Sequence, residues 1–183
     1  MADRRGFTLW FTGLSGAGKS TLARAVGDEL RSRRHLVELL DGDEVRKHLS
    51  RGLGFSKDDR DTNIRRIGYF ARVLSRNGVV TIAAAISPYR DVRDEIRREH
   101  EAPFVEIFVD CPLDELKKRD PKGLYAEALA GRLKNFSGVS DPYERPIAPE
   151  ITVHTDRETV DQSKAAIVNW LAGRGLLDGI DKA

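Results

Sequence analysis

The stretch that decides the fold is Gly13-Leu-Ser-Gly-Ala-Gly-Lys-Ser20, which directly follows the apolar run FTLWFT at residues 7–12. The spacing is that of the phosphate-binding loop G-x-x-x-x-G-K-S/T, which lies between a strand and a helix. Its glycines let backbone N–H groups turn toward phosphates, and the helix dipole adds to the field. We expect Lys19 to bridge β- and γ-phosphate oxygens and the Ser20 hydroxyl to bind Mg²⁺. The alternative, a glycine-rich turn that binds nothing, would need neither side chain.

Short apolar runs alternate with longer segments of helical periodicity along the chain. Runs that are apolar throughout are typical of parallel strands buried on both faces. The pattern predicts a single α/β domain over residues 1–183, a P-loop NTPase-type three-layer fold whose mainly parallel five-stranded sheet is flanked by helices. We expect strands at 7–12, 36–40, 79–84, 104–109 and 151–153. We expect helices at 18–34, 44–49, 57–77, 89–99, 113–118 and 159–171.

The segment at about 119–149 interrupts this alternation. From Lys122 to Pro149 it contains three prolines, Pro142, Pro146 and Pro149, and only a short helical stretch at 125–133. A long irregular segment inside a compact domain is more often a functional lid than a linker. We therefore expect a lid there.

The charge balance and the termini exclude several classes of protein. The 183 residues include 31 lysines and arginines against 29 aspartates and glutamates, a formal net charge of +2. A protein that coats nucleic acid would carry a larger basic excess, so no nucleic-acid partner is expected. The N-terminal apolar run is too short for a secretory signal or a membrane span. Cys111 is the single cysteine, so we expect a cytoplasmic protein without an intramolecular disulfide.

Two carboxylates follow the second predicted strand, in Asp41-Gly-Asp43. They would lie at the carboxyl end of the sheet, where ligands of open α/β folds bind. One could hold Mg²⁺ through water, and the other could accept a proton from an attacking hydroxyl. Position favours Asp43 as the base. Asp43 could alternatively be the N-cap of the next helix, and the two roles are compatible.

Arg46, Arg60 and Asn63 are candidate ligands for an anionic substrate. Arg60 and Asn63 are three residues apart and share a helix face, so both could point at one ligand. A guanidinium matches phosphate and sulfate oxygens in geometry and charge. The alternative is a solvated charged face. We prefer that alternative for four other arginines, Arg65, Arg66, Arg97 and Arg98.

Two phenylalanines and a serine stand out in loop-like settings. Phe55 and Phe136 could each be a core anchor, or the pair could hold a purine between their rings. Ser87, in Ile86-Ser-Pro88, ends the third predicted strand where a helix begins. It could cap that helix or line a site at the carboxyl edge of the sheet.

Taken together, these motifs resemble the adenylylsulfate kinase family, which acts on adenosine 5′-phosphosulfate (APS). The resemblance extends from residue 7 to about residue 171. It rests on residues 13–21, Asp41-Gly-Asp43, Gly52-Leu-Gly-Phe55, Arg60 with Asn63, Ile86-Ser-Pro88, Arg119-Asp-Pro-Lys-Gly-Leu-Tyr125 and Asp141-Pro-Tyr-Glu144. The phosphate-binding loop is generic. The run from Arg119 to Tyr125 and the Ile-Ser-Pro strand end are specific to this family among small P-loop kinases.

The resemblance implies the reaction ATP + APS → ADP + 3′-phospho-APS, with Mg²⁺ as cofactor and transfer to the ribose 3′-hydroxyl. It implies catalytic roles for Lys19, Asp43 and Ser87, and a metal site at Ser20 and Asp41. The implied ATP-binding residues are Gly13, Leu14, Ser15, Gly16, Ala17, Gly18, Lys19, Ser20, Thr21 and Arg119. The implied APS-binding residues are Asp43, Arg46, Phe55, Arg60, Asn63, Ile86, Ser87, Lys122, Leu124 and Phe136, with the two phenylalanines on either side of the adenine.

Some implications of the resemblance stay open. Ser87 matches the position of a phosphoserine intermediate, but direct in-line transfer needs no second nucleophile. The family implies a homodimer and functional coupling to ATP sulfurylase, whereas Cys111 cannot form the redox pair of plant relatives. The alternatives are another small-molecule P-loop kinase, for nucleoside monophosphates, gluconate or shikimate, and a non-catalytic partner domain of ATP sulfurylase. A GTPase switch is disfavoured because no N-K-x-D guanine motif is present.

Overall fold

Five parallel strands form the sheet of the computed structural model, which describes residues 5–178. The strands are β1 (Thr8–Thr12), β2 (Val37–Asp41), β3 (Val80–Ala84), β4 (Phe104–Asp110) and β5 (Ile151–His154). Their order across the sheet is β2-β3-β1-β4-β5. Every strand expected from the sequence is present with bounds shifted by at most one residue, so the predicted parallel sheet is confirmed.

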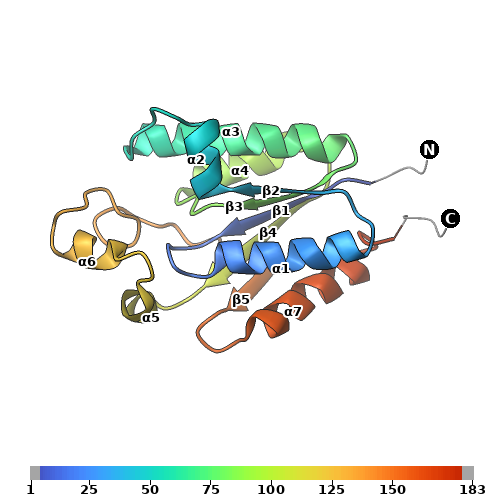
Figure 1. Cartoon of the computed structure of the whole chain (residues 1–183). Coiled ribbons are helices and arrows are strands. Elements are labelled where there is room, and N and C mark those ends of the chain that lie inside the picture. Colours follow the sequence, from blue (N-terminus) through green and yellow to red (C-terminus); the bar gives the residue numbers. More distant parts are fainter. Residues whose placement is uncertain (1–4, 179–183) are drawn as a thin grey trace.

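Helices cover both faces of the sheet (Figure 1). One face carries α1 (Lys19–Ser32) and α7 (Val160–Gly173), and the other carries α3 (Lys57–Arg76) and α4 (Arg90–Glu99). Three short helices lie toward the carboxyl ends of the strands: α2 (Gly42–His48), α5 (Leu113–Arg119) and α6 (Leu124–Leu129). The helix expected at 125–133 is shorter than predicted and ends at Leu129.

The start of α2 corrects one prediction. The helix begins at Gly42 because Asp41 is its N-cap, with Oδ1 accepting from the Asp43 backbone N–H at 3.0 Å. The proposal that Asp43 caps this helix is therefore wrong. Because Asp41 caps the helix, the Asp43 side chain is free for another role.

Successive residues of β1 bury their side chains on opposite faces of the sheet. Leu9 and Phe11 join the larger core cluster with the apolar residues of α1 and α7, whereas Trp10 packs with Ile64 and Ile96 in the cluster under α3 and α4. All five residues of β1 are buried. Burial on both faces explains why the strand is a continuous apolar run in the sequence.

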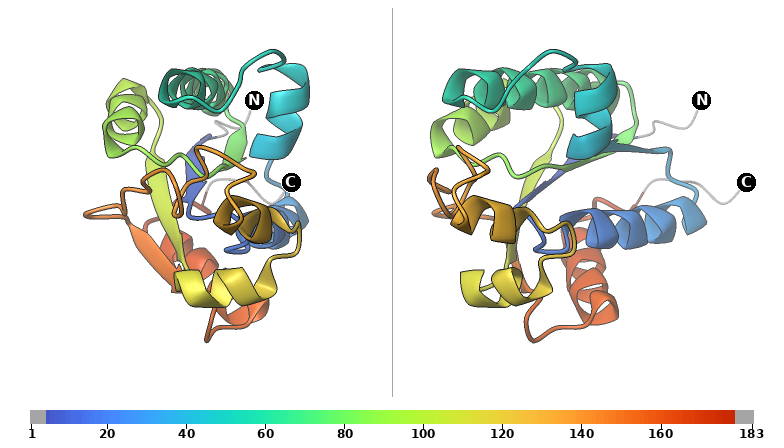
Figure 2. Two further views of the ribbon diagram at one scale, coloured as in Figure 1. Left: turned by 90° about the vertical axis from the view of Figure 1, so that its left-hand side faces the viewer. Right: turned by 60° about the vertical axis from the view of Figure 1, so that its left-hand side comes forward.

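The order of the strands creates a switch point at the carboxyl end of β1. The chain passes from β1 to β2 and β3 on one side, and to β4 and β5 on the other. Ligands of open α/β sheets bind where the loops diverge in this way. The segment between α5 and β5 crosses in front of this edge (Figure 2). Within residues 5–178, no helix has the length and apolar character needed to cross a membrane.

Candidate active site

The loop of residues 13–18 joins β1 to α1 and has the geometry of an anion cradle. Gly18 is the N-cap of α1 and has a φ of 97°, a left-handed conformation that glycine adopts without strain. A Cβ on Gly13 would lie 2.5 Å from the carbonyl oxygen of Val109, so glycine alone fits against β4 there. The first N–H groups of α1 lack intrahelical acceptors, and this helix end favours a phosphate.

Lys19 is the first residue of α1, and its side chain folds back over the loop. Its Nζ donates to the carbonyl oxygen of Leu14 at 2.7 Å. Burial lowers the pKa of Lys19 to about 8, although the nearby Asp43 carboxylate opposes this shift. An anionic ligand at the loop would raise this pKa again, because it favours the charged ammonium.

A cavity of about 290 Å³ opens beside the loop and collects most of the predicted residues. Those lining it are Ser15, Gly16, Gly18, Lys19, Ser20, Thr21, Asp41, Asp43, Arg46, Arg60, Asn63, Ile86, Ser87 and Lys122. Further residues that were not predicted as site residues also line the cavity, namely Gly42, Ile64, Ala84, Ala85, Pro88 and Pro121. All of these except Ala84 adjoin a predicted residue in the chain, and Gly42, Pro88 and Pro121 lie within motifs that carry the family resemblance.

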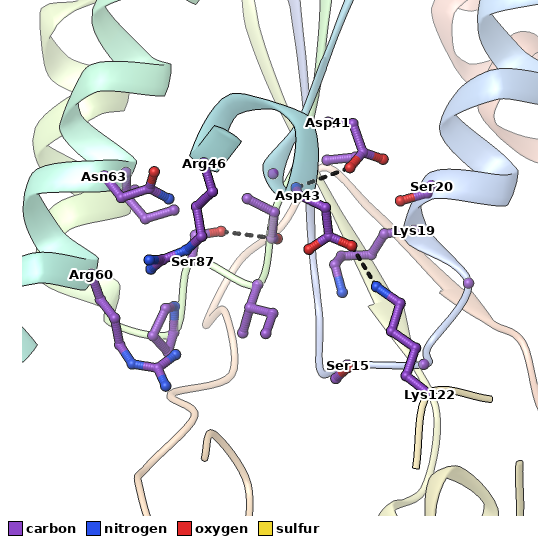
Figure 3. A pocket seen from close by; sticks show the side chains of 18 of the residues that line it. Ser15, Lys19, Ser20, Asp41, Asp43, Arg46, Arg60, Asn63, Ser87 and Lys122 are labelled. Carbon is purple, nitrogen blue, oxygen red and sulfur yellow. Dashed lines mark hydrogen bonds and ion pairs between the residues drawn. The ribbon is translucent and has the colours of Figure 1, made fainter. Parts of the chain in front are cut away.

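The side chains in the cavity form two groups that face each other (Figure 3). The first group comes from the end of β2 and the start of α1, and consists of Asp41, Lys19 and Ser20. The second comes from α2 and α3, and consists of Arg46, Arg60 and Asn63. Asp43 lies between the two groups. A phosphate donor at the first group and an acceptor at the second would therefore both lie beside this carboxylate.

Asp41 caps α2 with one oxygen and leaves the other for a ligand. Its Oδ2 is buried, has no hydrogen-bond partner among residues 5–178 and lies 3.8 Å from the Arg24 guanidinium. The Asp41 carboxylate and the Ser20 hydroxyl face each other (Figure 3). Mg²⁺ commonly takes one or two protein oxygens and completes its shell with phosphate oxygens and water. The two residues therefore fit a Mg²⁺-bound nucleotide. No cluster of three or more His, Cys, Asp or Glu side chains in the described chain forms a separate metal site.

Asp43 forms an ion pair with Lys122, which lies between α5 and α6 (Figure 3). The Lys122 Nζ donates to Asp43 Oδ2. Both side chains are largely exposed, so the pair contributes little to stability. It nevertheless brings the predicted lid onto the candidate base. The other oxygen, Oδ1, has no protein partner within the part of the chain that the structure describes.

Arg60 anchors the predicted lid to α3. Its Nε donates to the carbonyl oxygen of Phe55 at 3.0 Å, Nη1 donates to Ser137 Oγ at 3.0 Å, and Nη2 donates to the carbonyl oxygen of Asn135. Asn63 lies on the same helix face and is buried, and its Oδ1 has no partner in the described residues. The two residues thus share the cavity as the spacing predicted, but Asn63 alone keeps an unused buried acceptor.

The two phenylalanines lie in different environments. Phe55 is 53% exposed, with the Arg46 guanidinium carbon 4.4 Å from its ring centroid. Phe136 is 7% exposed and belongs to the main core cluster, where its ring meets Tyr125 edge-on at 5.0 Å. Neither ring lines the cavity. The adenine sandwich stays a prediction, and Phe136 would have to present a ring that is now packed in the core.

Ser87 lies in the cavity wall in a strained conformation. Its φ is 40°, and its side chain is buried with Oγ accepting from Trp10 Nε1 at 3.1 Å. Tyr89, and not Ser87, is the N-cap of α4, so the helix-cap interpretation is wrong. Backbone strain of this kind occurs where the surroundings hold a residue firmly, often at functional sites.

The remaining predicted residues, Gly13, Leu14, Ala17, Arg119 and Leu124, do not line the cavity. Leu124 packs against the main core. Arg119 donates to the carbonyl oxygen of Thr155 at 2.6 Å, and the Thr155 hydroxyl donates to the carbonyl oxygen of Ala17 at 2.8 Å. Arg119 therefore contacts the outer side of the phosphate-binding loop through Thr155, a residue for which the sequence offered no signal.

Comparison with known proteins decides the family. A family model described as adenylylsulphate kinase matches residues 5–154. The chain belongs to this family. It is 58% identical over 181 residues to the adenylyl-sulfate kinase of Myxococcus xanthus, an alignment that covers 97% of each chain. It also resembles the solved Mycobacterium tuberculosis APS kinase in complex with AMPPNP and APS, with a TM-score of 0.87, 38% identity and coverage of 92% and 98% of the two chains.

Some adenylylsulphate kinase domains are parts of longer proteins. The probable bifunctional SAT/APS kinase 2 of Sorangium cellulosum is 58% identical over 170 residues, which are 93% of this chain but 29% of that protein. Membership of the family decides against the gluconate, shikimate and nucleoside monophosphate kinases, and against a GTPase switch.

Proposed function

We propose that this chain transfers the γ-phosphoryl group of ATP to the ribose 3′-hydroxyl of APS, giving ADP and 3′-phospho-APS. The observation that carries the proposal is the place of Asp43, between the phosphate-binding loop and the polar group of α2 and α3 (Figure 3). The adenylyl-sulfate kinase of Myxococcus xanthus, at 58% identity, supports APS as the acceptor.

Positioning and charge neutralisation account for the catalysis. Phosphoryl transfer has a loose transition state and needs little covalent help from the protein. Lys19 and the N–H groups at the start of α1 neutralise charge on the transferred group. Arg46 and Arg60 supply positive charge on the acceptor side, where APS carries phosphate and sulfate oxygens. Asn63 offers its buried Oδ1 to a donor on the same substrate.

Asp43 is the general base of the proposed reaction. The 3′-oxygen forms a bond to the γ-phosphorus, the bond between that phosphorus and ADP breaks, and the hydroxyl proton passes to the carboxylate. Oδ1 is the oxygen available for this proton, because Lys122 pairs with Oδ2. Lys122 thereby links the carboxylate to the predicted lid.

Ser20 and Asp41 are the residues that would hold Mg²⁺. When bound with the nucleotide, the ion neutralises charge on the β- and γ-phosphate oxygens. The buried Oδ2 of Asp41, which has no hydrogen-bond partner among residues 5–178, supports this assignment, since a buried carboxylate oxygen normally accepts a hydrogen bond.

Ser87 contributes to the cavity wall and not to a covalent step. Its hydroxyl already accepts a hydrogen bond from Trp10, and direct transfer requires no phosphoserine. Ser87→Ala should retain turnover. Complete loss of turnover with intact APS binding would instead support a covalent intermediate.

The rest of the assignment follows the family resemblance. We propose that Arg119 helps to bind ATP, that Lys122, Leu124, Phe55 and Phe136 help to enclose APS, and that residues 119–149 act as the lid. We also propose a cytoplasmic homodimer that is functionally coupled to ATP sulfurylase; the bifunctional Sorangium relative supports the coupling. Light scattering on the purified chain tests the dimer.

The decisive experiment is a coupled ADP-release assay with ATP, Mg²⁺ and APS, run beside AMP, gluconate and shikimate. APS-dependent ADP with 3′-phospho-APS identified by mass spectrometry is the expected result. Turnover of another acceptor would refute the substrate assignment. ATP binding without turnover of any acceptor would favour a non-catalytic partner domain.

A further inference from the structure

Three consecutive carbonyl groups in one wall of the cavity are each held by a different part of the fold. The wall consists of Ile86, Ser87 and Pro88, all of which line the cavity. Their carbonyl oxygens accept, in chain order, from Thr12 Oγ1 at 2.8 Å, Arg93 Nη1 at 2.6 Å and Glu144 N at 2.8 Å. The left-handed conformation of Ser87 lies at the centre of this 86–88 wall. Such a conformation persists only where the surroundings fix it.

Arg93 is the residue that joins the wall to the rest of the domain. It lies in α4 with a side chain 2% exposed. Its Nε donates to Glu106 Oε1 at 2.8 Å, Nη1 donates to the carbonyl oxygen of Ser87, and Nη2 donates to the carbonyl oxygen of Glu144 at 2.7 Å. One guanidinium therefore connects β4, the 86–88 wall and the predicted lid. The planar guanidinium holds its N–H donors in fixed directions, so it can bond all three acceptors at the same time. The compact ammonium group of a lysine does not have this geometry.

The segment of residues 141–144 lies against both the wall and Arg60. Glu144 Oε2 accepts from the Arg90 backbone N–H at 2.7 Å, and Tyr89 Oη donates to Asp141 Oδ2 at 2.7 Å. The same Asp141 oxygen lies 3.8 Å from Arg60 Nε. Figure 2 shows the segment between α6 and β5 crossing the carboxyl edge of the sheet. The segment that contains Glu144, a partner of Arg93, thus also contains Asp141, which lies beside Arg60 on the acceptor side of the cavity.

The nucleotide side of the cavity shares none of the contacts of Arg93; it meets the wall only through Thr12, which directly precedes the phosphate-binding loop and bonds the Ile86 carbonyl among the residues that the structure describes. Within residues 5–178, Lys19, Ser20 and Asp41 make no hydrogen bond to Arg93, to Glu144 or to the 86–88 wall. A change at Arg93 should therefore move the acceptor side relative to a nucleotide side that stays in place.

We propose that Arg93, assisted by Trp10, is a positioning residue that holds the wall of the APS site. Trp10 fixes the hydroxyl of Ser87 and Arg93 fixes its carbonyl, so the two together define the conformation of the wall. The inference rests on the proposed function, which assigns this side of the cavity to APS. Neither Arg93 nor Trp10 lines the cavity; Arg93 acts through the backbone carbonyl of Ser87 and Trp10 through its hydroxyl.

The test compares Arg93→Lys with Arg97→Lys in the whole chain. Arg97 belongs to the same ion-pair cluster, at 3.3 Å from Glu106 and 2.5 Å from Glu150, but does not bond to the wall or to Glu144. Arg93→Lys keeps a positive charge beside Glu106 but loses the planar guanidinium that bonds Ser87 and Glu144. We expect it to raise the KM for APS by about tenfold or more, since small misplacements at a reacting site are costly. The KM for ATP should stay within about twofold of wild type, and Arg97→Lys should leave both constants unchanged.

Equal changes in both KM values of Arg93→Lys, or no change in either, would overturn the inference. If Arg93→Lys does not fold, Trp10→Phe keeps an aromatic ring in the core and removes the donor to Ser87 together with part of the buried ring volume. An increase in the APS KM of this variant with an unchanged ATP KM supports the inference, and an unchanged APS KM overturns it. A wild-type chain without APS turnover would refute the proposed function itself, whereas normal turnover with unaffected variants refutes the inference alone.

Discussion

Raising the pH from 7 to 9 should weaken nucleotide binding through Lys19. Burial lowers the pKa of this lysine to about 8 in the protein alone. Bound phosphate oxygens favour the charged form of Lys19, so the nucleotide binds more tightly to protein in which Lys19 is protonated. If the lysine stays charged in the complex, the dissociation constant scales as 1 + 10^(pH − 8) and rises about tenfold between pH 7 and 9.

Isothermal titration calorimetry with Mg²⁺ and AMPPNP measures this effect directly. Titrations at each pH in two buffers of different ionisation enthalpy give the protons taken up on binding. Near pH 8 the wild-type chain should take up about half a proton, because half of its lysines at position 19 are neutral. Lys122→Met should move the midpoint to higher pH, since Lys122 contributes to lowering the Lys19 pKa.

Lys19→Met is the control, because any proton uptake that it retains belongs to the nucleotide or to another group. Constant affinity from pH 7 to 9 in the wild type, without proton uptake, would refute the reasoning. Stability provides an independent check with a defined sign. The unfolded chain, with a lysine pKa near 10.5, binds more protons than the folded chain between pH 8 and 10.5, so this group makes unfolding less favourable as the pH rises through that window.

Three further predictions concern the base, the phenylalanines and a helix cap. Asp43→Asn should lower kcat by about 10²- to 10⁴-fold with ATP binding retained, and a loss below about tenfold in the coupled assay would contradict its role. Phe136→Ala should lower the free energy of unfolding by about 3–5 kcal/mol, because the ring is buried against Tyr125. Phe55→Ala should change it by less than about 0.5 kcal/mol; similar urea midpoints would refute the contrast. Thr159→Ala removes the capping box of α7 and should cost about 1 kcal/mol in thermal unfolding without changing either KM.

The layers of the fold were predictable because their causes are local or periodic. Each buried parallel strand is a continuous apolar run, and each covering helix repeats its apolar residues at the helical period. The bounds of α2 were harder to predict, since Asp41 and Asp43 are both good N-caps in sequence. The observed hydrogen bond from the Asp43 N–H to Asp41 selects one of them.

The phosphate-binding loop was predictable for a related reason. Its glycine conformations, its lysine and its helix N-terminus all lie within one short stretch of the chain, so spacing alone specifies the cradle. The three-residue spacing also predicted correctly that Asn63 and Arg60 share one helix face. It could not reveal that Arg60 bonds the segment near Asn135 and Ser137, more than 70 residues away.

By itself, the sequence determined the α/β class, the nucleotide cradle and the set of polar residues that gather at one edge of the sheet. The tertiary structure alone decided which of them meet. It paired Lys122 with Asp43, buried Phe136 in the core and connected Arg93 to the wall around Ser87. The physical reason is that local patterns set the backbone conformation of each element. Contacts between residues far apart in the chain depend on how those elements pack.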